Sequence, residues 1–141
     1  MTSEEQVGER NYGGMSEERA PRSYRDLLVW QKGIVLAKRI YKLTGSFPAE
    51  EKFGLISQIR RAAVSIAPNI AEGQARHTTK EFVQFVSHAE GSLAEVDTQL
   101  TLAVELGYLT DAVAKESCDL VSELRKMLNS LRRKLVEGTA Q

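Results

Sequence analysis

Residues 82–103 read FVQFVSHAEGSLAEVDTQLTLA, and the spacing of the apolar side chains in this stretch decides the fold class. Apolar residues recur at alternating intervals of four and three, on Phe82, Val86, Ala89, Leu93, Val96, Leu100 and Ala103. This heptad spacing predicts a helix over about residues 79–106 that packs at a low angle against other helices. Thr78 and Glu81 are placed to cap its start, and Gly107 is placed to end it.

Apolar lines at the same spacing predict three more helices, over about residues 24–43, 49–72 and 111–136. In the first, we expect the core to be lined by Leu27, Trp30, Ile34, Ala37 and Tyr41. The second carries Ile56, Ile59, Ala63, Ile66 and Ile70. In this helix Pro68 should introduce a kink, and Gly73 should end it in a left-handed conformation. The last carries Val121, Leu124, Leu128, Leu131 and Leu135. Because the connections are short, we predict an all-α, antiparallel up-down-up-down four-helix bundle.

A chain of 141 residues suits one domain, which we place over residues 23–137. Residues 1–22 are polar and nearly free of large aliphatic side chains, so we expect a disordered tail there. No apolar run is long enough to span a membrane and no signal segment is evident, which predicts a cytoplasmic protein without a membrane partner. The single cysteine, Cys118, is consistent with a reducing compartment.

Some apolar residues lie off these lines and cannot face the axis of a single bundle. In the first helix they are Leu28, Val29, Val35, Leu36 and Ile40, and in the third Val83, Phe85, Leu102 and Val104. A wide apolar surface of this kind favours packing against another subunit. The other interpretation is a large core with a few exposed aliphatic side chains.

A polar line runs beside the apolar line of the second helix, and part of a similar line follows the third. The line on the second helix comprises Gln58, Arg61, Ser65, Asn69 and Glu72. The line on the third helix includes His88, Ser92 and Glu95. In an antiparallel pair Arg61 should lie near Ser92 and Glu95, so we predict a charge-assisted contact between Arg61 and Glu95. The line is either a binding site or a hydrogen-bond network that fixes helix register and subunit arrangement.

Basic residues gather on three segments, although the formal net charge is zero. They are Lys38, Arg39 and Lys42 on the first helix, Arg76 in the second connection, and Arg125, Lys126, Arg132, Arg133 and Lys134 on the last helix. In an oligomer each cluster is repeated, and repeated contacts to phosphate would give affinity without reading of sequence. Bases near the end of a helix also have a simpler explanation, because they interact favourably with the helix dipole.

No catalytic arrangement is convincing in this sequence. The two histidines, His77 and His88, do not follow a glutamate at the spacing of a di-iron site, and Cys118 has no zinc-ligand spacing with them. No nucleophile elbow or phosphate-binding loop is present. We therefore predict a non-enzyme with no cofactor, no metal and no evident small-molecule substrate.

The ordered residues from Tyr24 to Leu109 resemble the family of small four-helix-bundle proteins encoded in intervening sequences of bacterial 23S ribosomal RNA genes. The resemblance rests on Leu28, Trp30, Phe47-Pro48, Gln58-Ile59-Arg60-Arg61-Ala62, Ser65-Ile66, Asn69-Ile70-Ala71-Glu72-Gly73, Gly91-Ser92-Leu93-Ala94-Glu95 and Gly107-Tyr108-Leu109. It implies a homopentamer. Distant relatives look like accessory proteins of diversity-generating retroelements, which implies RNA or a reverse transcriptase as partner.

Two functional hypotheses follow from these patterns. The first is an oligomeric accessory protein that binds structured RNA or a nucleic-acid enzyme through its basic surface. The second is a protein–protein interaction or scaffold bundle with no nucleic-acid role. Salt dependence distinguishes them, because only the first predicts an affinity that falls steeply with ionic strength.

Overall fold

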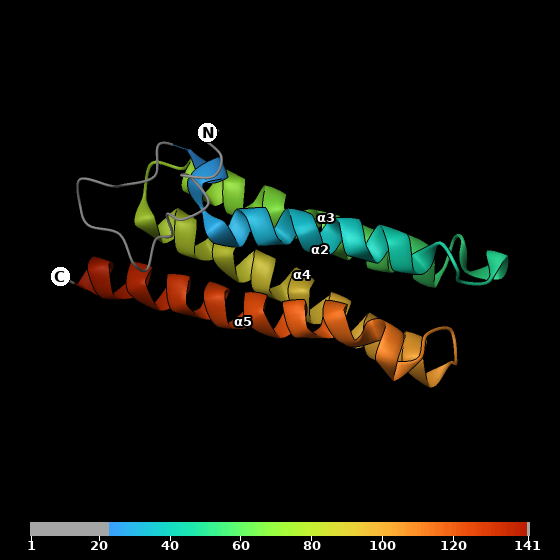
Figure 1. The fold of residues 1–141 in the computed structure, drawn as a ribbon. Coiled ribbons are helices and arrows are strands. Elements are labelled where there is room, and N and C mark those ends of the chain that lie inside the picture. Colours follow the sequence, from blue (N-terminus) through green and yellow to red (C-terminus); the bar gives the residue numbers. More distant parts are fainter. Residues whose placement is uncertain (1–22, 141) are drawn as a thin grey trace, which may run out of the picture.

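The computed structural model describes residues 23–140, and in that range the chain forms four long helices joined by short connections (Figure 1). They are α2 (Leu28–Thr44), α3 (Leu55–Gln74), α4 (Thr79–Glu105) and α5 (Asp111–Ala140). Both α2 and α4 pack against α3 and α5, so α2 and α4 occupy opposite corners of the bundle. The predicted all-α four-helix bundle is confirmed. The predicted disordered tail over residues 1–22 lies outside the described residues.

Two of the helices begin later than the sequence predicts, because a short 3-10 turn precedes each of them. These turns are η2 (Tyr24–Asp26) and η3 (Ala49–Glu51). Leu27 is extended between η2 and α2, and Gly54 has non-helical dihedral angles between η3 and α3. The Glu51 carboxylate then accepts a hydrogen bond from the Leu55 amide at 3.1 Å, which satisfies one of the free N–H groups at the start of α3.

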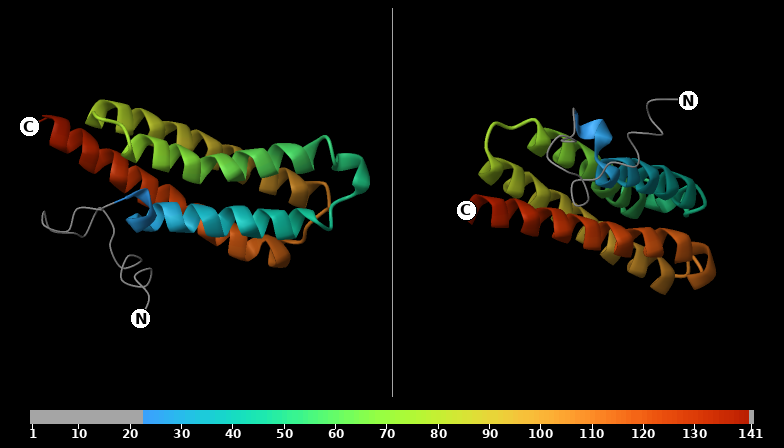
Figure 2. Two further views of the ribbon diagram at one scale, coloured as in Figure 1. Left: turned by 90° about the horizontal axis from the view of Figure 1, so that it is seen from above. Right: turned by 60° about the vertical axis from the view of Figure 1, so that its left-hand side comes forward.

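Two ion pairs show that α2 and α5 are antiparallel. Lys32 of α2 pairs with Glu123 of α5 at 3.0 Å, and Arg39, one turn from the end of α2, pairs with Glu116 near the start of α5. Figure 2 shows that the α2–α3 and α4–α5 connections lie at one end of the bundle, whereas the α3–α4 connection lies at the other end with the C-terminus.

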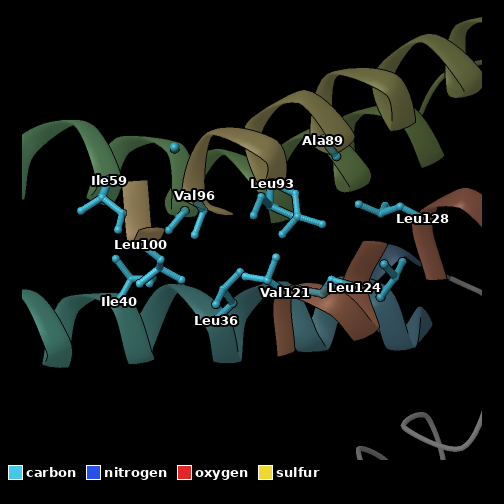
Figure 3. Packing of buried hydrophobic residues seen from close by; sticks show 14 of the residues in the cluster. Leu36, Ile40, Ile59, Ala89, Leu93, Val96, Leu100, Val121, Leu124 and Leu128 are labelled. Carbon is cyan, nitrogen blue, oxygen red and sulfur yellow. The ribbon is translucent and has the colours of Figure 1, made fainter. Parts of the chain in front are cut away.

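The core lies along the bundle axis and is built from the predicted lines of α3, α4 and α5 (Figure 3). All seven predicted residues of α4 are buried. Of the predicted residues in α3 and α5, Ile56 and Leu135 are partly exposed and the others are buried. The heptad spacing therefore identified the inward face of three helices correctly.

The predicted core line of α2 is correct only in part. Leu27 is buried, and Trp30 and Ala37 are partly buried against the core, but the other two members are not. Ile34 and Tyr41 are 39% and 48% exposed, whereas Leu36 and Ile40 are fully buried. The buried line of this helix comprises Val29, Gly33, Leu36, Ile40 and Thr44. At Gly33 a Cβ atom would lie 3.5 Å from the Cβ atom of Ala67, which is an ordinary van der Waals distance, so this position lies directly against α3. Leu36 and Ile40, assigned to a subunit contact from the sequence, instead form the core.

The two glycines predicted to end helices have different roles. Gly107 has φ 81°, and the amides of Gly107 and Tyr108 donate to the carbonyls of Val104 and Ala103, so a Schellman motif ends α4 as predicted. Gly73 lies inside α3, so its predicted left-handed conformation is wrong. A Cβ atom there would meet the Phe85 Cβ atom at 2.8 Å, so Gly73 is required by close packing.

Candidate functional site

The predicted polar line lies on the outer seam between α3 and α4. At its centre the Ser65 and Ser92 hydroxyl oxygens lie 2.7 Å apart and join the two helices. The Asn69 side-chain amide donates to the Ser65 carbonyl oxygen at 2.8 Å, within a helix that is continuous through Pro68. This part of the line is a half-buried hydrogen-bond network that joins α3 and α4.

A hollow of about 310 Å³ opens beside this network, and we call it the α3–α4 hollow. Its lining residues are Gln58, Arg61, Ala62, Ser65 and Glu95. The predicted proximity of Arg61, Gln58 and Glu95 is therefore correct. The predicted Arg61–Glu95 contact is wrong, because neither hydrogen bond nor ion pair joins the two side chains. Both are exposed, and neither has a partner among the described residues.

The other two charged or aromatic members of the line have local partners. Glu72 pairs with Arg76 at 2.8 Å, one helical turn further along. His88 packs edge-on against the Phe85 ring, with ring centroids 5.6 Å apart. These residues lie toward the α3–α4 connection and do not line the α3–α4 hollow.

A second depression of about 260 Å³ lies on the α4 side of Glu95. It is lined by Gly91, Ala94, Glu95, Thr98 and Gln99. The side-chain oxygen of Gln99 is buried and has no hydrogen-bond partner within the described part of the chain. Glu95 therefore lies between two hollows, and the small residues Gly91 and Ala94 line the second of them.

Most of the predicted nucleic-acid-binding arginines are neutralised by carboxylates of the same chain. Arg39 pairs with Glu116, Arg125 with Asp97 at 3.3 Å, and Arg132 with Glu90 at 2.9 Å. Arg76 pairs with Glu72 and lies over the Phe85 ring, 4.8 Å from its centroid. The sequence did not lead us to predict the acidic partners of Arg125 and Arg132. The antiparallel register that placed Arg61 near Glu95 would also have placed α4 acids beside α5 bases.

Four of the predicted bases are exposed and make no ion pair within residues 23–138. They are Lys38, Lys42, Lys126 and Arg133. Lys134 is also exposed. The α2 and α5 members are separated along the bundle, because Lys38 and Lys42 lie near the Arg39–Glu116 pair whereas Lys126 and Arg133 follow Glu123 toward the C-terminus. The structure therefore does not gather all predicted bases into one patch.

Charge is unevenly distributed between opposite corners of the bundle. Helix α2 contains four bases (Lys32, Lys38, Arg39 and Lys42) and no acid. Helix α4 contains one base and five acids (Glu81, Glu90, Glu95, Asp97 and Glu105). A formal net charge of zero thus conceals a cationic α2 surface and an acidic α4 surface.

The residues that the structure describes give little support to a metal site or to a reactive Cys118 thiol. None of their His, Cys, Asp and Glu side chains form a group of three or more that could hold a metal ion. Partial burial raises the pKa of the Cys118 thiol, and the nearby carboxylates of Asp97, Asp119 and Asp111 raise it further. A raised pKa keeps the thiol protonated and weakly nucleophilic.

The fold and the site together define a four-helix-bundle protein with a polar hollow on one side and a cationic helix on the other. The sequence model of the family described as 23S rRNA-intervening sequence protein matches residues 25–130, and the chain belongs to this family. Within residues 23–140, no helix is both long and apolar enough to cross a membrane.

One solved structure with the same fold is that of a protein with unknown function from the S23 ribosomal protein family of Bacteroides thetaiotaomicron VPI-5482. Its TM-score is 0.69 at 23% sequence identity, over 75% of this chain and 96% of that chain. At this identity the similarity concerns the fold alone. No curated protein matches the chain.

Proposed function

We propose that the protein is a non-enzymatic, oligomeric accessory protein that binds structured RNA, or an enzyme acting on nucleic acid, through its cationic α2 surface. The observation that carries this proposal is the composition of α2, which has four bases and no acid. Two of these bases are neutralised by Glu123 and Glu116 of α5. Lys38 and Lys42 are exposed and free of ion pairs among the described residues, so they are available to phosphate.

Helix α5 packs beside α2, and its own exposed bases lie apart from those of α2, nearer the C-terminus. Lys126 and Arg133 contribute two further exposed bases. Such contacts position an RNA backbone without reading its bases, so we expect binding that is weakly sequence-specific and strongly dependent on salt.

Oligomerisation would multiply these few bases into a multivalent surface. Two features of the bundle support self-association. Helix α2 exposes the apolar side chains of Ile34, Val35 and Tyr41, and α4 exposes Leu102 at the opposite corner. Contact between different surfaces of successive copies closes into a ring when the rotation permits it.

A protein–protein interaction bundle with no nucleic-acid role is the second candidate function. It is favoured by the ion pairs that occupy Arg39, Arg76, Arg125 and Arg132. Arginine is the side chain best suited to bidentate contact with phosphate, and four of the eight arginines that the structure describes already contact carboxylates.

The test is binding of the full-length protein to a structured RNA hairpin across a salt series, with solution mass measured on the same sample. The double variant Lys38→Ala/Lys42→Ala should weaken binding and lower the slope of log affinity against log salt by about one unit per lost contact. Lys52→Ala/Lys80→Ala, which removes two exposed lysines outside α2, is the matched control. Equal losses in both variants would show that α2 is not the binding surface, whereas affinity independent of salt would support the second candidate instead.

A further inference from the structure

Arg61 and Glu95 carry opposite charges on two sides of one hollow, yet they do not pair. Elsewhere on the same bundle Arg76, Arg125 and Arg132 all reach carboxylates within 3.3 Å. The α3–α4 hollow thus presents one guanidinium and one carboxylate whose partners are absent from residues 23–138. A ligand between them could satisfy both groups.

The rest of the lining adds polar groups along one side of this hollow. Gln58 lies on α3 one turn before Arg61, and Ser65 lies one turn after it, with Ala62 between them. The Ser65 oxygen is 2.8 Å from the Ala62 carbonyl oxygen and 2.7 Å from the Ser92 oxygen, so its position is fixed. At about 310 Å³ the hollow falls at the lower end of the range for small-molecule sites.

The two charges together select the class of ligand. A simple anion attracted to Arg61 would be repelled by Glu95, and a simple cation attracted to Glu95 would be repelled by Arg61. A molecule that carries both a carboxylate and an ammonium group avoids both penalties. The planar guanidinium can bind a carboxylate with two parallel hydrogen bonds, and a glutamate can accept hydrogen bonds from an ammonium group.

We propose that the α3–α4 hollow binds a free zwitterionic α-amino acid, with its carboxylate on Arg61 and its ammonium group on Glu95. Gln58 and Ser65 then face the side chain of the ligand and favour a polar one. This site is separate from the RNA-binding surface proposed above, because it lies on α3 and α4 rather than on α2. It gives the bundle a small-molecule ligand in addition to any macromolecular partner.

The experiment is a titration of the isotope-labelled full-length protein with each of the twenty amino acids, up to about 10 mM, followed by the NMR shifts of its backbone amides. For any amino acid that binds, the N-acetyl derivative removes the positive charge and the carboxamide removes the negative charge. We expect saturable shifts at Arg61, Ser65 and Glu95 with the zwitterion. Each derivative should bind about tenfold more weakly or worse, because it loses a charge-assisted contact.

Variants assign the two charges to the two residues. Arg61→Gln and Glu95→Gln should each lower the affinity about tenfold or more. Lys52→Gln and Glu105→Gln, which change exposed charges outside the hollow, should leave it unchanged. All four side chains are exposed, and circular dichroism will verify that each variant is folded.

Two results would overturn the proposal. The first is the absence of saturable shifts with all twenty amino acids. The second is an altered solution mass of Arg61→Gln and Glu95→Gln without amino-acid binding by the wild type, which would assign the residues to a contact between subunits. Neither result depends on RNA binding, so this proposal and the proposed function fail independently.

Discussion

Two pairs of neighbouring helices in this bundle are held together by different physics. Between α3 and α4 the contact is close, because Gly73 lets the Phe82 and Phe85 side chains approach the α3 backbone. The polar link across this seam is a pair of hydroxyl groups 2.7 Å apart. Between α2 and α5 the contact is the least extensive of the four, and two ion pairs cross it.

The difference indicates which side of the molecule is rigid and which is adaptable. Close packing depends on shape and is insensitive to salt, whereas ion pairs on a surface contribute little and are screened. The α3–α4 pair should therefore form the fixed frame of the bundle and hold the α3–α4 hollow in shape. The α2–α5 contact should respond most to salt and to a charged partner.

The largest expected effect tests which side of α2 belongs to the core. Leu36→Ala removes a fully buried side chain and should lower the free energy of unfolding by about 2–5 kcal/mol. Ile34→Ala, in the same helix but 39% exposed, should cost less than about 1 kcal/mol. Urea denaturation measures both variants, and a larger loss for Ile34→Ala would mean that α2 is rotated in solution.

The next effect tests close packing between α3 and α4. Gly73→Ala places a Cβ atom 2.8 Å from the Phe85 Cβ atom and should destabilise the protein by about 1–3 kcal/mol through overpacking. Gly91→Ala is the matched control, because a Cβ atom there meets nothing within 4 Å. The control should gain about 0.5–1 kcal/mol from helix propensity. Equal changes in the two variants would contradict a packing role for Gly73.

The same two regions show how much of the fold could be predicted from sequence. In α4 one apolar line continues without interruption over seven positions, whereas the remaining apolar residues form no continuous line, and the prediction was correct. In α2 two apolar lines lie side by side, and the spacing of the apolar residues alone does not show which line is buried in the core. Packing against α3 makes the choice, because the line that faces α3 is the one through Gly33, whose Cβ position is 3.5 Å from the Ala67 Cβ atom. Which line of α2 is buried therefore depends on the surface of the partner helix α3.

The sequence predicted which residues of the candidate site lie at the same height on α3 and α4. It did not predict which of their side chains are in contact. Antiparallel pairing sufficed to bring Arg61, Gln58 and Glu95 to one hollow. It could not decide whether Arg61 reaches Glu95, because rotamers of long side chains on a surface are set by small free-energy differences. The ion pairs of Arg125 and Arg132 were accessible to the same reasoning, since both join residues at matching heights of α4 and α5.

A smaller effect tests the ionic nature of the α2–α5 contact. A double-mutant cycle on Lys32 and Glu123, whose charged atoms are 3.0 Å apart, should give a coupling of about 0.2–1 kcal/mol. Because the pair is partly exposed, the coupling should decrease in 1 M salt. A cycle on Lys115 and Asp119, an ion pair within α5, provides the comparison. A coupling that salt leaves unchanged would show that packing, rather than charge, joins α2 to α5.

The smallest expected effect concerns the end of the bundle where the two pairs of helices are tied together. The Tyr108 hydroxyl, just after α4, donates to the Glu51 carboxylate, just before α3, at 2.7 Å. The amide of Leu55 and then the Tyr108 hydroxyl lower the pKa of Glu51 from its ordinary 4.5. The hydrogen bond to Glu51 is the main cause that raises the pKa of Tyr108 from its ordinary 10.0.

These two shifts define a window of pH in which the contact stabilises the fold. The lowered pKa of Glu51 gives a contribution that is present above 4.5 and is lost as pH falls through the folded value. The raised pKa of Tyr108 gives a contribution that is present below 10.0 and is lost as pH rises through the folded value.

Tyr108→Phe should therefore lower the melting temperature slightly near neutral pH and flatten its dependence on pH at both limits. Tyr41→Phe, which removes a hydroxyl without a partner among the described residues, should leave the profile unchanged. Identical profiles for wild type and Tyr108→Phe would mean that the hydrogen bond to Glu51 contributes nothing to the stability of this end.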